Sequence, residues 1–219
     1  MSLFNRIAIG TANWGKKYRG VQVPQKDKER ILEVAYEWGI NTVDTAVAYE
    51  NDVYELAYDK WFKIIDKIPD RWHIVKQIRP YAILAHCSPS RHMIEWLEKI
   101  KKEGECDKIG WSIYSNDAKP DLDIIQIPYN PYDRLAIEYV NQLDKGNMEL
   151  HVRSIFCAGK ALKEFGVKSC MMFALMNPKI DKVVMGFDSF DQFRDDLEWI
   201  VTLENSWSNN PDVYDTRRF

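Results

Sequence analysis

Residues 39–51 have the sequence GINTVDTAVAYEN, and the fold expected for the rest of the chain depends on this stretch. A glycine ends the preceding segment, and residues 41–46 (NTVDTA) follow as a short strand-like run. Most of the other runs of this length are nearly continuous in apolar residues, which is typical of strands covered on both faces and therefore of a parallel sheet. Such runs lie at residues 6–11, 41–46, 72–77, 81–86, 108–113, 123–128, 149–156 and 182–187.

Helical patterns lie between several of these runs. Residues 27–38 carry apolar side chains at helical spacing and are followed by Gly39, and residues 90–103 repeat the pattern after Ser88-Pro89, which we expect to cap that helix. A third amphipathic stretch near residues 190–201 begins with Ser189 and Gln192 in capping-box register. Strands that alternate with helices predict the α/β class, and eight strands predict a (β/α)8 TIM barrel.

The barrel is expected to be compact, because 219 residues divided by eight strands leave about 27 per unit, against about 31 in a 250-residue barrel. The helix between the third and fourth strands (72–77 and 81–86) should be missing, and the one between the fifth and sixth should be missing or reduced. An antiparallel hairpin of 72–77 with 81–86 is the alternative. We expect one domain over residues 1–219, with a polar C-terminal tail at 205–219.

Composition excludes several classes of protein. The formal charge is -3, with 30 Lys and Arg against 33 Asp and Glu, so we expect no nucleic-acid partner. No stretch approaches the apolar length of a membrane-spanning helix, and we expect a cytoplasmic protein without a membrane partner. The four cysteines show no metal-ligand spacing, so no metal site is expected. The sequence is compatible with a monomer and leaves the oligomeric state open.

Ionisable residues stand at the carboxyl ends of three successive predicted strands. Asp44 ends the second strand, Tyr49 follows five residues later, Lys76 stands near the end of the third and His86 ends the fourth. In a (β/α)8 barrel the carboxyl ends of the strands form the mouth that holds the reactive residues. Each residue taken alone also fits a structural role, whereas the set predicts one site. A hairpin of 72–77 with 81–86 would separate Lys76 from His86 and break this site.

These phrases together resemble the aldo-keto reductases. The resemblance runs in the family's order over residues 6–204, through GTANWG, GINTVDTAVAYEN, IVKQ, LAH, IGWS, IIQIPYN, HVRSIF and VVMGFDSFDQFRDDL. It implies that Asp44, Tyr49, Lys76 and His86 form the catalytic tetrad of a nicotinamide-dependent carbonyl reductase. Tyr49 would then donate a proton, Lys76 would make that donation easier, Asp44 would hold Lys76, and His86 would orient the carbonyl.

The resemblance also implies a cofactor site. Ser112 and Gln126 match the residues that hold the nicotinamide carboxamide in that family, and Tyr129 matches an aromatic that stacks on the nicotinamide ring. Arg153 and Ser154 match positions near the pyrophosphate, for which a planar guanidinium is well suited. The start of the last helix would bind the rest of the nucleotide, with a plain capping box as the alternative for two of its residues. These positions are Gly186, Asp188, Ser189, Gln192, Asp195 and Asp196.

The expected function is the reduction of small aldehydes or ketones with NADPH, and NADH remains an alternative. A rival hypothesis is a barrel that binds the nucleotide without turnover, as a sensor or an assembly partner. A barrel of other chemistry, such as an isomerase or a lyase, lacks a supporting constellation beyond a lone Lys76.

Overall fold

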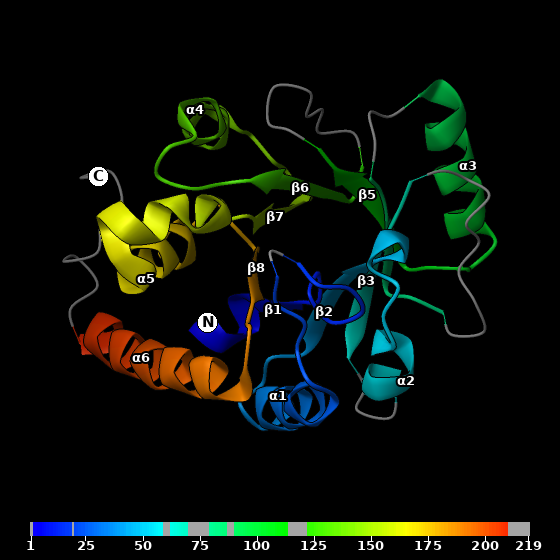
Figure 1. The fold of residues 1–219 in the computed structure, drawn as a ribbon. Coiled ribbons are helices and arrows are strands. Elements are labelled where there is room, and N and C mark those ends of the chain that lie inside the picture. The colour runs from blue at the N-terminus through cyan, green and yellow to red at the C-terminus, as the bar shows by residue number, and fades with distance from the viewer. Residues whose placement is uncertain are drawn as a thin grey trace.

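In the computed structural model, eight parallel strands close into a barrel in chain order, with β1 pairing β8 to complete the wall (Figure 1). The structure describes residues 2–18, 20–58, 62–69, 79–86, 90–113 and 122–209. The strands are β1 (Ile7–Gly10), β2 (Thr42–Ala46), β3 (Lys63–Ile68), β4 (Ala82–Ala85), β5 (Lys108–Ser112), β6 (Ile124–Pro128), β7 (Glu149–Arg153) and β8 (Lys182–Gly186).

Helices cover the wall unevenly. They are α1 (Gln25–Glu37), α2 (Val53–Tyr58), α3 (Arg91–Lys102), α4 (Arg134–Gln142), α5 (Lys160–Leu175) and α6 (Phe190–Asn209). The described residues also include three short 3-10 helices, η1 (Leu3–Arg6), η2 (Val47–Tyr49) and η4 (Cys157–Gly159). No helix lies in the described parts of the β3–β4 and β5–β6 connections. The prediction of a compact (β/α)8 barrel that is reduced at these two connections is confirmed.

The position of the third strand was predicted wrongly. The strand between β2 and β4 is Lys63–Ile68, not 72–77, which lies outside the described residues. Its charged residues, Lys63, Asp66 and Lys67, interrupt the apolar pattern by which buried strands are identified. The antiparallel hairpin is wrong as well, because β4 pairs with β3 on one side and β5 on the other, both in parallel.

Two predicted helix boundaries also change. The cap of α3 is Ser90, whose hydroxyl accepts a hydrogen bond from the amide of Met93 at 3.2 Å, rather than Ser88. Helix α6 continues through Asn209, so the first residues of the predicted tail at 205–219 are helical. Residues 210–219 lie outside the described part of the chain.

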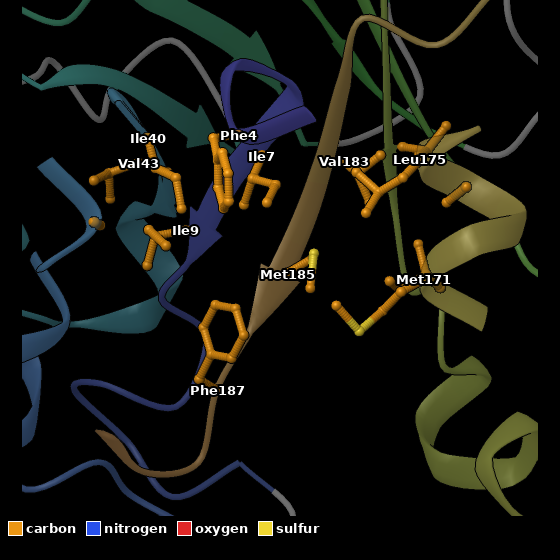
Figure 2. Packing of buried hydrophobic residues seen from close by; sticks show 14 of the residues in the cluster. Phe4, Ile7, Ile9, Ile40, Val43, Met171, Leu175, Val183, Met185 and Phe187 are labelled. Carbon is orange, nitrogen blue, oxygen red and sulfur yellow. The ribbon is translucent and has the colours of Figure 1, made fainter. Parts of the chain in front are cut away.

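The main core lies between the barrel wall and the helices outside it. In Figure 2, Val183 and Met185 of β8 face Met171 and Leu175 of α5. A smaller cluster fills the inside of the barrel, formed by Ile65, Ala82, Leu84 and Ile124. Successive strand residues therefore alternate between the two cores, and this alternation decides which polar side chains reach the mouth.

Gly110 of β5 allows a close approach between two strands. A Cβ atom at this position would lie 2.1 Å from the carbonyl oxygen of Ile124 on β6. No helix in the described part of the chain is long and apolar enough to cross a membrane.

Candidate active site

The carboxyl ends of β2, β3 and β4 bring three ionisable side chains together at the mouth of the barrel. On β3, Lys67 follows the inward-facing Ile65 by two residues and is therefore directed to the interior. The backbone of Lys67 is in register with Leu84 of β4, and the amide of His86 donates to the carbonyl of Ile68 at 2.8 Å. The barrel register thus sets Lys67 and His86 side by side, next to Asp44 of β2.

Lys67 and Asp44 form a buried ion pair. The Lys67 ammonium donates to Oδ1 of Asp44, and the two side chains are only 1% and 4% exposed. Removing one partner would leave an uncompensated buried charge, which costs several kcal/mol. Lys67 therefore occupies the place beside Asp44 that was expected for Lys76, and Lys76 itself lies outside the described residues.

Tyr49 faces this pair from the loop after β2. The Lys67 ammonium lies 5.3 Å from the centroid of the Tyr49 ring, and the Tyr49 and His86 rings meet edge to face with centroids 6.4 Å apart. Burial raises the pKa of the Tyr49 hydroxyl, while the charges of Lys67 and Arg153 and a hydrogen bond with Lys67 act to lower it. The net pKa is raised, and the cations limit the rise.

The loop that carries Tyr49 is held on β1 and the loop after it. The Asn51 side-chain amide donates to the carbonyl of Thr11 at 3.1 Å. Gly15 approaches so closely that a Cβ atom there would lie 2.2 Å from the carbonyl oxygens of both Tyr49 and Glu50. Glu50 has a positive φ of 50°, an uncommon conformation for a residue other than glycine. These constraints fix the position of the phenol ring.

His86 is neutral at physiological pH. Burial, together with the positive charges of Lys67 and Arg153, lowers the pKa of its imidazole to about 4, against the opposing effect of Asp44. A neutral imidazole still has one N–H donor, so His86 can hydrogen-bond a carbonyl oxygen without carrying a charge.

Ser112, Gln126 and Arg153 lie beside this cluster. The Ser112 hydroxyl donates to Oε1 of Gln126 at 2.8 Å, and Nε2 of Gln126 donates to Oδ2 of Asp44 at 2.7 Å. Nε of Arg153 donates to the Ser112 hydroxyl oxygen at 3.3 Å, and Nη1 of Arg153 lies 3.4 Å from the Ser154 hydroxyl. Gln126 therefore contacts the expected catalytic residue Asp44 directly, and Ser112 and Arg153 are linked to Asp44 through Gln126.

Tyr129 does not lie at the mouth. Its side chain is 2% exposed and stacks on Phe173 of α5, with ring centroids 4.8 Å apart. Its hydroxyl accepts a hydrogen bond from Asn177 at 3.0 Å. The expectation that Tyr129 stacks on a nicotinamide ring is wrong, because the residue follows the end of β6 with its side chain on the helix-covered side of the wall.

The start of α6 is capped by the chain's own side chains. The backbone amide of Gln192 donates to the Ser189 hydroxyl at 3.2 Å, which is one half of the predicted capping box. The Gln192 side chain accepts from the backbone amide of Asp188 at 2.8 Å, one residue before the expected Ser189. The Phe190 amide donates to a carboxylate oxygen of Asp27 at 3.0 Å, a contact that the sequence did not suggest. An anion at this helix end would compete with Asp27 for the Phe190 amide.

The remaining expected cofactor residues lie around this helix end. Oδ1 of Asp188 accepts from the Asn13 side-chain amide at 2.8 Å, and Asp195 accepts from Arg194 at 3.0 Å. Burial, together with the charge of Asp195, raises the pKa of Asp196 to about 6. Gly186 ends β8 in register with Gly10 of β1.

Comparisons with known proteins identify the fold. No family model matches the chain, and no curated protein matches its sequence. Among solved structures, PA4992 from Pseudomona aeruginosa, a protein assigned to the aldo-keto reductases, superposes with a TM-score of 0.71 at 16% identity over 89% of both chains. The holo form of the aldo-keto reductase AKR11C1 from Bacillus halodurans superposes with a TM-score of 0.70 at 18% identity, over 88% of this chain and 85% of that one.

The thermostable aldo-keto reductase Tm1743, in complex with the inhibitor epalrestat, superposes with a TM-score of 0.62 at 15% identity over 88% of each chain. At identities this low the superposition is evidence about the fold alone. It covers nearly the whole length of both chains in each comparison. The chain therefore has the fold of the aldo-keto reductases, in a form reduced at the β3–β4 and β5–β6 connections.

Proposed function

We propose that this protein is a nicotinamide-dependent carbonyl reductase in which Tyr49 donates the proton and Lys67, rather than Lys76, is the lysine of the catalytic set. The observation that carries the proposal is the cluster of Asp44, Lys67, Tyr49 and His86 at one end of the barrel. Carbonyl reduction needs an acid beside the oxygen, a cation beside that acid and a donor that orients the carbonyl. The cluster holds one of each.

The electrostatics of the cluster fit these roles. A phenol buried in the protein is a poor acid, and the adjacent ammonium of Lys67 counters this by stabilising the phenolate that remains after proton donation. Asp44 keeps Lys67 charged and oriented. Neutral His86 can donate to the carbonyl oxygen without competing with Tyr49 as an acid.

The residues at the mouth also fit a nicotinamide nucleotide. Ser112 and Gln126 present a hydroxyl and an amide, the groups that pair with a carboxamide. Gly186 leaves open space, since a Cβ atom there would meet only the carbonyl oxygen of Gly10, at 3.7 Å. Ser112 and Gln126 would hold the nicotinamide end, with Arg153 and Ser154 near the phosphates, and the bound cofactor would supply the hydride.

NADPH is the nucleotide that we propose, with NADH as the alternative. Arg30 of α1 lies with its guanidinium carbon 3.8 Å from the centroid of the Phe190 ring, at the start of α6. Arg30 therefore supplies a cation at the start of this helix. We propose that the adenosine half is contacted by Gly186, Asp188, Ser189, Gln192, Asp195 and Asp196. A cation there favours a nucleotide that carries an extra phosphate.

The substitution Tyr49→Phe tests the proposal. We expect NADPH oxidation with a panel of small aldehydes and ketones to fall by about a thousandfold, because the acid is removed. Tyr132→Phe is the matched control, since Tyr132 is exposed and donates to Glu164 on the surface. Near-wild-type turnover in Tyr49→Phe would exclude Tyr49 as the acid.

The same experiment separates a reductase from a protein that only binds the nucleotide. NADPH binding is followed by quenching of the intrinsic fluorescence, and turnover by the loss of NADPH absorbance after a carbonyl compound is added. Binding without turnover for every carbonyl compound in the panel would favour the sensor or assembly role and reject the reductase.

A further inference from the structure

A continuous line of buried hydrogen bonds joins the expected carboxamide contacts to the expected proton donor. It runs from Ser112 through Gln126 and Asp44 to Lys67, which lies against the Tyr49 ring. Counted with their backbone atoms, Gln126 and Lys67 have no solvent exposure, and Ser112 and Asp44 are each 3% exposed. Solvent therefore does not substitute for any member of this line.

The direction of each hydrogen bond follows from the chemistry of the groups. An ionised carboxylate only accepts, so the amide nitrogen of Gln126 must face Asp44 and its oxygen must face Ser112. The Ser112 hydroxyl must then donate its single proton to Gln126, which leaves its oxygen to accept from Arg153. Every donor in the line points toward Asp44.

Both oxygens of Asp44 are thereby engaged, each by a different partner. Oδ1 accepts from the Lys67 ammonium, and Oδ2 accepts from the Gln126 amide. A carboxylate that shares its charge with an amide donor neutralises a neighbouring ammonium less completely. Gln126 therefore leaves more of the positive charge of Lys67 to act on the Tyr49 hydroxyl.

We propose that Gln126 is a positioning residue whose coupling to Tyr49, through Asp44 and Lys67, makes Tyr49 a stronger acid. This inference rests on the proposed function, in which Tyr49 donates the proton. The hydrogen bond from Gln126 to Asp44 is fully buried, so water does not replace it when the Gln126 amide is removed. No proton passes along the line, and the effect on Tyr49 is electrostatic.

The charged groups around Tyr49 set the direction of the effect. Lys67 and Arg153 favour the phenolate and Asp44 disfavours it, while His86 is neutral. Without the Gln126 amide, Asp44 concentrates its charge on Lys67, so the phenolate is less stable and Tyr49 becomes a weaker acid. Gln126 therefore acts to make Tyr49 a stronger acid.

The test follows the ionisation of Tyr49 directly, without turnover. Tyrosine is labelled with carbon-13 in the ring, the Tyr49 signal is assigned by its loss in Tyr49→Phe, and its titration is followed by NMR. For Gln126→Leu we expect the titration midpoint to rise by about one pH unit relative to the wild type.

Two further variants control for loss of structure. Asn177→Leu removes a similarly buried amide on the outer side of the wall, where it donates to Tyr129, and should leave the Tyr49 midpoint unchanged. Gln126→Met keeps a side chain of similar length and likewise removes the amide. It should raise the Tyr49 midpoint as much as Gln126→Leu, and it serves if the leucine variant does not fold.

Steady-state kinetics give a second measurement. Gln126→Leu should lower kcat by about tenfold and move the alkaline fall of the reduction rate to higher pH, since Tyr49 must be protonated to act. An unmoved Tyr49 midpoint in an enzyme that still binds NADP and reduces carbonyls would overturn the coupling alone. Failure of the wild type to bind NADP would overturn both the coupling and the proposed function.

Discussion

The ammonium of Lys67 on β3 donates to the carboxylate of Asp44 on β2 inside the barrel, and the two side chains are 1% and 4% exposed. A lysine with so little contact with water carries a cost in desolvation that the ion pair only partly offsets. Such a pair is weak evidence for a stabilising role. Its position against the Tyr49 ring instead suggests that it serves proton donation.

Substitution of the two candidate lysines should therefore give opposite results. We expect Lys67→Met to lower kcat for carbonyl reduction by about a thousandfold, because the cation that stabilises the Tyr49 phenolate is lost. Lys76→Met should retain kcat within about twofold if Lys67 is the lysine of the site. Steady-state assays of both variants with NADPH decide between them, and a large loss in Lys76→Met alone would restore the assignment to Lys76.

Asp66 gives a prediction about stability. Its carboxylate lies on the outer side of β3, is 2% exposed and accepts a hydrogen bond from the Tyr54 hydroxyl at 2.7 Å, while its other oxygen has no partner among the described residues. Burial raises the pKa of Asp66 from 3.8 to about 6, although Tyr54 and Lys67 act to lower it. The folded protein therefore favours the protonated acid.

The contribution of Asp66 to the free energy of unfolding falls as the pH rises. Because the pKa of Asp66 is higher in the folded chain than in the unfolded one, its favourable contribution is complete below about pH 4 and is lost as the pH rises to about 6. At neutral pH, Asp66→Asn should raise the free energy of unfolding by up to about 3 kcal/mol. Urea unfolding from pH 4 to pH 7 measures this gain, which should shrink toward zero at the acid end. Asp107→Asn, half exposed at the surface, is the control.

Much of the fold can be predicted from local patterns of apolar residues, and the strand that was predicted wrongly has a physical explanation. Strands β1, β4 and β6 can be recognised in the sequence as apolar runs, because each is buried on both faces. Strand β3 lacks such a run, because Lys67 turns inward to Asp44 and Asp66 turns outward to Tyr54, and each of these partners is at least 12 residues away in the sequence. The apolar residues Ile64, Ile65 and Ile68 are the part of the strand pattern that the sequence does show.

Local sequence patterns also place only some of the residues of the candidate site. Asp44, Tyr49 and His86 could be placed because strand ends in a barrel converge, whichever strand supplies the lysine. Tyr129 directly follows β6, and the side of the barrel wall that it faces depends on the residue at which that strand ends. The motif IIQIPYN does not determine where the strand ends. The contact of Asp27 with the start of α6 joins residues from opposite ends of the chain, so no local pattern could predict it.

The packing of Gly15 against the Tyr49 loop gives a prediction about catalysis. A Cβ atom at Gly15 would lie 2.2 Å from two backbone carbonyl oxygens, so Gly15→Ala must displace the loop that carries Tyr49. We expect kcat to fall by about a hundredfold, while KM for NADPH changes little, because a displacement of about 1 Å is enough to spoil proton donation.

Gly20→Ala provides the comparison for this variant. Gly20 lies in the same loop with a φ of 86° and nothing near its missing side chain, so alanine there introduces backbone strain without a collision. This variant should keep most of the wild-type kcat. An equal loss of kcat in both variants would mean that strain in the loop, rather than contact with Tyr49, limits catalysis.

Arg30 gives a prediction about the choice of nucleotide. Its guanidinium lies over the Phe190 ring at the start of α6, where Asp27 already accepts the hydrogen bond of the Phe190 amide. A phosphate bound here would therefore depend more on Arg30 than on the helix end. Arg30→Leu should raise KM for NADPH by about tenfold and leave KM for NADH within about twofold, a difference that parallel assays with the two nucleotides measure. Equal changes for both nucleotides would show that Arg30 acts on a part of the cofactor that NADH shares, and no change for either would place the 2′-phosphate elsewhere.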